Sequence, residues 1–194
     1  MQYVFDFFGG RDRRPQRPER LFFGLMPDRE AVNQVAGFRD QYMSANHLHG
    51  VGLRPDRFHL SLHHVGDYKR LPTRLIYAAQ QAARAVSMGP FEVGFRFLTS
   101  FEPAPHKKDR RPLVLLGEGG EALATLFRTL GIALTRNGLR AAVQFTPHMT
   151  LAYGPDAVPL REIEPIRFAA KDFVLIHSRL GLTQYEIIDR WTLA

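Results

Sequence analysis

The chain has 194 residues, of which 45% are hydrophobic and 23% charged, with a formal net charge of +7 and no cysteine. These proportions are typical of a globular protein with one sizeable domain, or with two small lobes that share an interface. The lack of cysteine excludes disulfides, thiolate nucleophiles and cysteine-ligated zinc, and no apolar run is long enough to cross a bilayer. The positive charge favours a polyanionic partner without identifying it.

The chain begins with a basic segment that shows no apolar periodicity. Residues 9–20 are rich in Arg, Pro and Gly, which is typical of a chain that does not pack. We predict a flexible basic N-terminal arm over residues 1–19, which either contacts a nucleic acid or is an inert solvated leader. Because residues 1–8 have neither a basic region before the apolar part nor a small-residue cleavage site, we expect no secretory signal and a cytoplasmic location.

Strands and helices alternate after this arm. Apolar runs and alternating patterns predict strands at residues 21–26, 58–65, 91–99, 113–116, 145–153, 172–177 and 185–193. Apolar residues at helical spacing predict three helices: one capped by Asp28, one at about residues 72–86 and one at residues 120–136.

The loop between two of these strands, residues 101–112, is strongly basic. It contains Lys107, Lys108, Arg110 and Arg111 after His106. We predict a basic flap that holds a phosphate backbone, with a solvated hairpin as an equal alternative. We assign no function to His106 or to His177.

Two strand-like segments, one in each half of the chain, pair an imidazole with a hydroxyl. In His59-Leu60-Ser61-Leu62 and in His148-Met149-Thr150-Leu151, strand alternation places the histidine and the hydroxyl on one face. A single such triplet means little, because chance supplies about one in a chain of this composition. Two copies, each with apolar residues between and after the polar ones, predict a shared site.

A helix precedes each motif strand, so each half contains a strand–helix–strand unit. Two such units packed side by side would give two sheets whose facing strands form a cleft. That geometry places His59 and Ser61 opposite His148 and Thr150.

These four side chains suit phosphodiester chemistry. A neutral and a protonated imidazole on opposite sides of a substrate supply a general base and a general acid near neutral pH. The hydroxyls can donate hydrogen bonds to phosphate oxygens as charge builds up. The sequence has no G-x-S-x-G nucleophile elbow and no P-loop, and the motif strands carry no carboxylate. Serine-hydrolase, NTP-hydrolysing and metal-dependent chemistry are therefore disfavoured, and we predict no metal and no cofactor.

The motifs resemble those of the two-histidine (2H) phosphoesterases, and among them the LigT-like RNA 2′,3′-cyclic phosphodiesterases, also called 2′-5′ RNA ligases. The family signature is a pair of H-x-[ST]-hydrophobic motifs, matched here by residues 59–62 and 148–151. Residues 20–25 look like the family's opening strand, residues 145–148 like the approach to the second motif, and residues 178–193 like the closing hairpin.

The resemblance implies an α+β, bilobal fold. It has two pseudo-symmetric lobes with antiparallel sheets around a central cleft and helices outside, here as a single domain over residues 20–194. It also implies that His59 and His148 are the acid and the base, and that Ser61 and Thr150 bind the phosphate. Which histidine is the base depends on whether the 2′ or the 3′ oxygen leaves, and the sequence does not settle this.

The chain departs from the family pattern at two positions. LigT-like members often have an aromatic residue two places after the first motif and an Arg two places after the second, where this chain has His64 and Tyr153. We predict that both bind substrate: Tyr153 stacks on a base or donates its hydroxyl, and His64 lies over a nucleobase. We expect His63 to point with Leu60 and Leu62 away from the cleft and to be structural.

We therefore predict a metal-independent enzyme that hydrolyses a 2′,3′-cyclic phosphate, on an RNA end or a nucleotide, to a 2′-phosphomonoester. We expect a monomer without a membrane partner, and leave open a 2′-5′ RNA ligase side activity. Two alternatives stay open: another 2H substrate, such as a 2′-5′-linked oligonucleotide or ADP-ribose cyclic phosphate, and a non-catalytic module that binds RNA ends.

Overall fold

The computed structural model of the chain describes residues 16–104, 109–182 and 184–194. Most of the predicted arm (residues 1–15) and part of the predicted flap (His106, Lys107 and Lys108) lie outside these ranges. The first strand begins at Glu19, one residue inside the predicted arm.

The described chain forms three helices, one short 3₁₀ helix (η1) and nine strands. In order they are β1 (Glu19–Leu25), α1 (Arg29–Ala45), β2 (Val51–Gly52), η1 (Pro55–Arg57), β3 (Leu60–Tyr68), α2 (Thr73–Arg84), β4 (Phe91–Ser100), β5 (Arg111–Gly117), α3 (Glu121–Arg136), β6 (His148–Gly154), β7 (Arg161–Ala170), β8 (Asp172–Arg179) and β9 (Gln184–Thr192).

The strands form a sheet in the order β7-β4-β5-β6-β3-β1-β8-β9, in which β2 also pairs with β6. All of these pairs are antiparallel. The sequence predicts two sheets, whereas here the two halves join at β3 and β6 through the pair Leu60 and Met149. The two motif strands are therefore direct neighbours at the centre, and each half continues outward from its motif strand.

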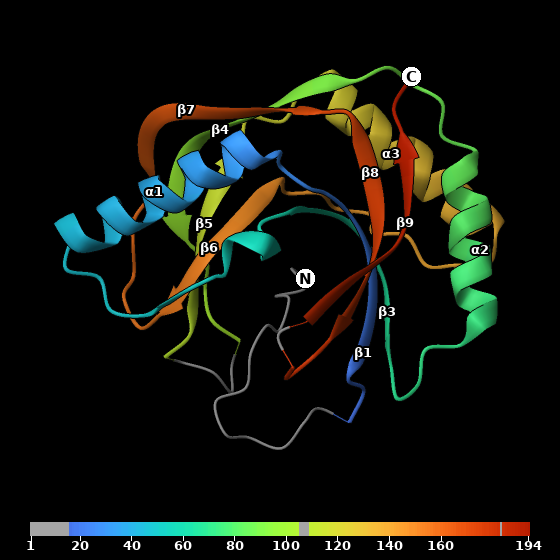
Figure 1. Cartoon of the computed structure of the whole chain (residues 1–194), viewed down its shortest axis with the longest axis horizontal. Coiled ribbons are helices and arrows are strands. Elements are labelled where there is room, and N and C mark those ends of the chain that lie inside the picture. The colour runs from blue at the N-terminus through green and yellow to red at the C-terminus, as the bar shows by residue number, and fades with distance from the viewer. Residues whose placement is uncertain (1–15, 105–108, 183) are drawn as a thin grey trace.

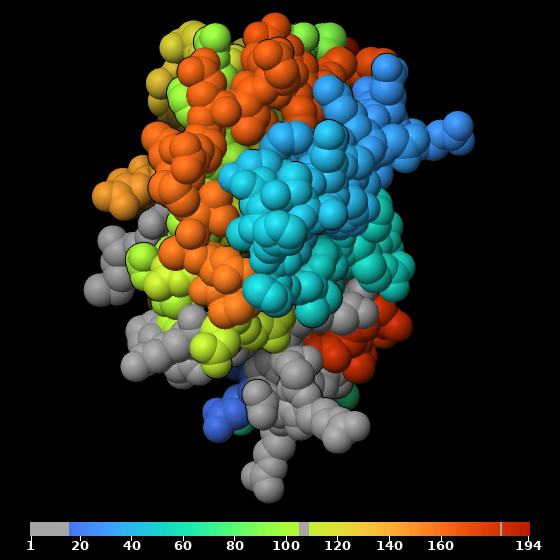
Figure 2. All heavy atoms as spheres, turned by 90° about the vertical axis from the view of Figure 1, so that its left-hand side faces the viewer, coloured from blue at the N-terminus to red at the C-terminus, as the bar shows by residue number. Residues whose placement is uncertain are grey.

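The two crossover helices tie the halves of the sheet together. Helix α1 follows β1 but packs on β6 and β7, whereas α3 follows β5 and packs on β3 as well as on β4 (Figure 1). Figure 2 shows α1 lying directly beside β7 on one face of the molecule. None of the described helices is long and apolar enough to span a membrane.

Strand β1 is buried on both of its faces. Leu21, Phe23 and Leu25 belong to the main hydrophobic core under the helices. Phe22 belongs to a separate small cluster with Val174 and Ile176 on the opposite face of the sheet, which we call the cleft face after the cleft predicted from the sequence. Burial on both faces explains why this strand is almost continuously apolar rather than alternating.

The sequence did not predict β7, and the reason lies in its proline. Pro165 lacks a backbone N–H and interrupts the strand pattern of this segment, but a proline is tolerated in an edge strand or at a bulge. Strand β7 is at the edge of the sheet, and its register with β4 shifts between the pairs Phe95–Ile166 and Phe97–Glu162. Pro165 falls within this shift, where the regular ladder is interrupted.

Candidate active site

Strand β3 contains a β-bulge directly after its motif hydroxyl. Ser61 is opposite Gly24 of β1, but His63 is opposite Phe23, so one extra residue is inserted between them. Strict alternation from Ser61 would place His63 on the cleft face and His64 on the other face. The bulge reverses this, so that His64 shares the cleft face with Ser61.

Strand β6 contains a bulge at the equivalent place. Thr150 is opposite Val114 of β5, whereas Ala152 is opposite Leu113, so these two side chains lie on opposite faces. Tyr153 therefore returns to the face of Thr150. The motif strands thus present matching sets of side chains to the cleft, namely His59, Ser61 and His64 from one half and His148, Thr150 and Tyr153 from the other.

The two motifs also lie side by side on neighbouring strands, where the two halves of the sheet join. Leu60 and Met149 pair in an antiparallel register, so His59 lies on the side of Thr150 and Ser61 on the side of His148. The structure therefore brings together the predicted catalytic and phosphate-binding residues.

Both motif histidines are oriented in the same way by the backbone. The Nδ1 of His59 is 2.8 Å from the carbonyl oxygen of Arg57, and the Nδ1 of His148 is 2.8 Å from that of Thr146. A carbonyl only accepts, so in each ring Nδ1–H is the donor and Nε2 is the atom that exchanges a proton. The Nε2 of His59 is 3.0 Å from the Ser61 hydroxyl, which donates to it when the ring is neutral.

The two imidazoles differ in their surroundings. His59 is 6% exposed. Its ring centroid lies 5.1 Å from that of Phe22 and 5.6 Å from that of Tyr185. His148 is only partly buried, and its ring centroid lies 5.0 Å from that of Phe101, with the two ring planes at 70°. The first half therefore encloses its histidine more tightly than the second.

This enclosure lowers the pKa of both histidines. Burial lowers the pKa of His59 to about 4; the hydrogen bond to Arg57 opposes the shift, and the Arg57 cation and His148 add to it. Burial also lowers the pKa of His148, against the hydrogen bond to Thr146. Since both values lie below the usual 6.5, both rings are neutral in the free protein at pH 7.

The cleft face of β1 and β3 also carries a hydrogen-bonded ionic group. Both oxygens of Asp67 accept from Arg20 at 2.7 Å, and Asp67 lies 2.9 Å from the Nε2 of His64. Burial alone would raise the pKa of Asp67, but the hydrogen bonds from Arg20 and His64 hold it well below its usual range. His64 is thereby held at a fixed place on the cleft face.

Replacing Asp67 with Asn is expected to lower the free energy of unfolding by about 2 kcal/mol at pH 7, because it leaves the buried Arg20 poorly compensated. The native carboxylate stabilises the fold above the unfolded-state pKa, near 4, and this contribution is lost as pH falls toward the lowered native pKa. Denaturant unfolding between pH 7 and 3 should therefore show the difference shrinking below about pH 4.

The matched control for this substitution is Glu162→Gln, which removes the exposed ion pair with Arg96 and should change stability by less than about 1 kcal/mol. An Asp67→Asn effect that is no larger than this, or that does not change with pH, would contradict the assigned role of Asp67.

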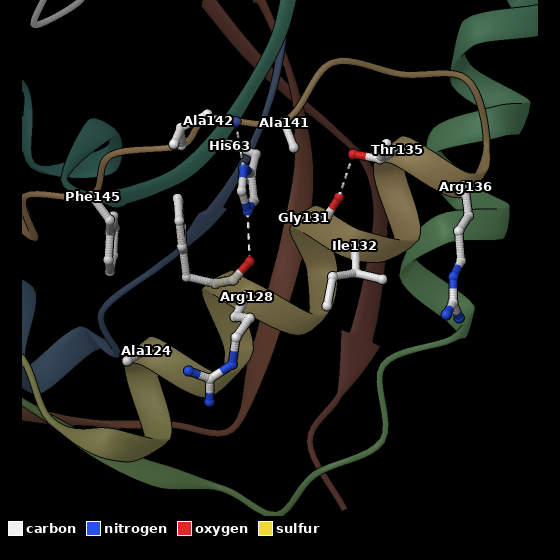
Figure 3. A pocket seen from close by; sticks show the side chains of 12 residues that line it. His63, Ala124, Arg128, Gly131, Ile132, Thr135, Arg136, Ala141, Ala142 and Phe145 are labelled. Atoms are coloured by element: carbon white, nitrogen blue, oxygen red, sulfur yellow. Dashed lines mark hydrogen bonds between the residues drawn. The ribbon is translucent and has the colours of Figure 1, made fainter.

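His63 lies on the helix side of the sheet, as expected, although the bulge rather than regular alternation puts it there. Its Nε2 donates to the carbonyl of Phe127 at 2.8 Å, and its Nδ1 accepts from the Ala142 N–H at 3.1 Å (Figure 3). Its ring stacks on Phe127 at 4.1 Å. It lines a groove between α3 and the segment before β6, away from the motif hydroxyls, and its role is structural.

Arg57 and Tyr185, which contact each other beside His59, were not predicted as site residues from the sequence. Arg57 is 2% exposed, and its guanidinium lies 4.1 Å from the ring centroid of Tyr185. The available signal was weak: Arg57 lies two residues before His59, and Tyr185 begins the last predicted strand. Nothing local shows that these distant segments meet.

The flap contributes one described basic residue to the site. The Arg110 guanidinium is 5.4 Å from the ring centroid of Tyr153, whereas Arg111 forms an ion pair with Glu102 at 2.9 Å. Within the described ranges, no three His, Asp or Glu side chains form a group that could hold a metal ion.

Similarity to known proteins identifies the family of the chain. The chain matches the sequence model of the 2′-5′ RNA ligase superfamily over residues 27–185. No curated protein sequence matches it.

Solved structures share the fold at low sequence identity. Escherichia coli LigT complexed with 3′-AMP superposes with a TM-score of 0.71 at 21% identity, covering 91% of this chain and 99% of LigT. LigT in its apo form gives 0.67 at 23% identity, over 92% and 99% of the two chains. TT0787 of Thermus thermophilus gives 0.69 at 19% identity, over 90% and 97%. With the family match spanning most of its length and both motifs, the chain belongs to the 2′-5′ RNA ligase superfamily of two-histidine phosphoesterases.

Proposed function

We propose that the protein is a metal-independent phosphodiesterase that hydrolyses a 2′,3′-cyclic phosphate, on an RNA end or a nucleotide, to a 2′-phosphomonoester. The observation that carries this proposal is the matching pair of imidazoles, each fixed through Nδ1 by a backbone carbonyl and each sharing a cleft face with a hydroxyl. Structures of LigT with 3′-AMP and with ATP support a nucleotide-type substrate.

The reaction needs two proton transfers at one phosphorus. The Nε2 of one histidine takes a proton from the attacking water, and the protonated Nε2 of the other gives a proton to the leaving 3′ oxygen. The bond between phosphorus and that oxygen breaks, and the phosphate stays on the 2′ oxygen. Each transfer contributes about 10²- to 10⁴-fold to the rate.

Ser61 and Thr150 are proposed to bind the non-bridging phosphate oxygens. In the free protein the Ser61 hydroxyl lies 3.0 Å from His59, so an incoming phosphate oxygen replaces the imidazole as its acceptor and frees Nε2 for the reaction. Preorganised hydroxyl donors in a half-buried site stabilise the developing negative charge more strongly than water does.

Of the two roles predicted for Tyr153, we propose the hydroxyl donor. Its side chain is 8% exposed and its ring is covered by Arg110, which leaves little surface for a base to stack on. Burial raises the pKa of Tyr153, against the opposing effects of Arg110 and of a hydrogen bond with Thr150, so the hydroxyl keeps its proton.

Replacing Tyr153 with Phe is expected to lower kcat/KM about tenfold, because one charge-assisted hydrogen bond to the substrate is lost while the ring packing is kept. Steady-state kinetics on a cyclic nucleotide measure this. Tyr77→Phe, at an exposed site on α2, is the control and should not change the kinetics. An unchanged kcat/KM for Tyr153→Phe would remove Tyr153 from the site.

His64 remains our second substrate-binding proposal. It shares the cleft face with Ser61, and its contact with Asp67 fixes the ring near the middle of β3. We propose that it contacts the nucleoside part of the substrate, since the phosphate is held between the two histidines. We also propose that the protein acts as a monomer in the cytoplasm.

The optimum of kcat/KM is expected on the acidic side of neutrality, between about pH 4 and 6.5. The working state carries one proton on the pair of histidines, and both pKa values are lowered. As pH rises through the higher of them the pair loses its last proton, and kcat/KM falls about tenfold per further pH unit. A pH–rate profile from about pH 3.5 to 9 measures this, and an optimum above about pH 7.5 would contradict it.

A further inference from the structure

On the basis of the proposed function, we propose that Arg57 is a positioning residue for His59 and that it acts through its position between His59 and Tyr185. Arg57 ends η1 and is 2% exposed. Its carbonyl oxygen accepts the Nδ1–H of His59 at 2.8 Å, and its guanidinium stacks on Tyr185 at 4.1 Å. One residue therefore holds the imidazole through its backbone and reaches the enclosing aromatic ring with its side chain.

Tyr185 completes the enclosure from the far end of the chain. Its ring lies edge-on to His59, at 5.6 Å and 75°, and to Phe22, at 5.7 Å and 70°. Phe22 in turn contacts His59 at 5.1 Å. The stacked arginine fixes the position of the Tyr185 ring, and the Tyr185 ring limits the movement of the imidazole.

Arg57 places a positive charge beside His59. The residue is 2% exposed, and its guanidinium lies over the Tyr185 ring, where a cation–π contact favours the charged group. A positive charge beside His59 favours the neutral imidazole, and it adds to the attraction of the cleft for an anionic phosphate.

Arg57 contacts His59 through its backbone carbonyl and Tyr185 through its side chain, which is why its role is positioning rather than catalytic. Arg57 and, from the neighbouring strand β6, His148 both lower the pKa of His59. Tyr185 faces it from β9, and its pKa is raised by burial, so it stays neutral. Arg20 of β1 acts on Tyr185.

The experiment compares Arg57→Met, which removes the charge, with Arg57→Lys, which keeps it. The titration of the His59 ring is followed by NMR of its Cε1–H signal, assigned with His59→Ala, and kcat/KM is measured against pH. The matched control is Arg39→Met: Arg39 is also buried, stacks over Phe58 at 5.6 Å and donates to the Leu53 carbonyl.

We expect Arg57→Met to move the His59 titration to higher pH and to lower kcat/KM at the optimum by about 10- to 100-fold. Arg57→Lys should keep the titration close to that of the wild type and recover part of the rate. Arg39→Met should reduce stability but leave the titration unchanged. If Arg57→Met does not fold, the same two measurements are made on Arg57→Gln, which also removes the charge.

The inference is overturned if His59 titrates in Arg57→Met or Arg57→Gln as it does in the wild type. It is also overturned if Arg39→Met shifts the His59 titration by the same amount, because Arg57 would then be only a structural residue. The NMR titration needs no substrate. A shifted titration in a protein that hydrolyses no cyclic phosphate would therefore refute the proposed function and leave the role of Arg57 standing.

Discussion

Replacing His59 or His148 with Ala is expected to lower kcat on a nucleoside 2′,3′-cyclic phosphate by about 10²- to 10⁴-fold each. Each substitution removes one of the two proton transfers at the phosphorus. Because the two rings act as a unit, the double variant should lose little more than either single variant. Steady-state kinetics of the three variants measure this directly.

The same variants should keep most of their affinity for a nucleoside 2′-monophosphate, which calorimetry can measure. The hydroxyls of Ser61 and Thr150 remain in place to hold the phosphate. His49→Ala, at an exposed histidine, is the control and should behave like the wild type. Lost affinity in the motif variants of a protein that shows no turnover would instead indicate a module that binds RNA ends.

Removing the hydroxyls is expected to have the second largest effect. Ser61→Ala and Thr150→Val should each lower kcat by about 10²- to 10³-fold, the usual cost of losing one donor to a developing oxyanion. Most of the loss should appear in kcat rather than in KM, because the charge on the phosphate oxygens is greatest in the transition state.

The matched control for the hydroxyl variants is Thr135→Val on α3, whose hydroxyl donates to the Gly131 carbonyl at 3.0 Å. It should keep its activity. If Thr150→Val and Ser61→Ala also retain wild-type kcat, the hydroxyls do not stabilise the transition state, and the phosphate must be held elsewhere in the cleft.

The motif residues could be predicted from sequence because their arrangement is local. An imidazole and a hydroxyl two residues apart share a face of any strand, and both H-x-[ST] copies do so here. The family resemblance extended this to the fold, which the match over residues 27–185 and the LigT structures confirm.

Strand alternation could not predict on which face of the sheet the residues after each motif lie. Alternation from Ser61 puts His64 outside the cleft, and alternation from Thr150 does the same for Tyr153. Both return to the cleft because each strand carries a bulge, and a bulge is set by the register with the neighbouring strand. That register depends on residues distant in the sequence.

The remaining differences have the same origin. Pro165 hides β7 because only the finished sheet shows that this strand lies at an edge. Arg57 looks like an ordinary surface arginine until the closing hairpin brings Tyr185 onto it. The two predicted sheets join because Leu60 and Met149 meet across the pseudo-symmetric halves, which no pattern within either half reveals.

The proposed function is tested most directly by incubating the wild-type protein with a nucleoside 2′,3′-cyclic phosphate in excess EDTA and resolving the 2′- and 3′-monophosphate products. We expect turnover in EDTA with the 2′-phosphomonoester as product. Turnover that stops in EDTA, or a 3′-monophosphate product, would contradict the proposed mechanism. No turnover at all would contradict the proposed substrate, and the same assay with 2′-5′-linked oligonucleotides and ADP-ribose cyclic phosphate would then separate another two-histidine activity from binding alone.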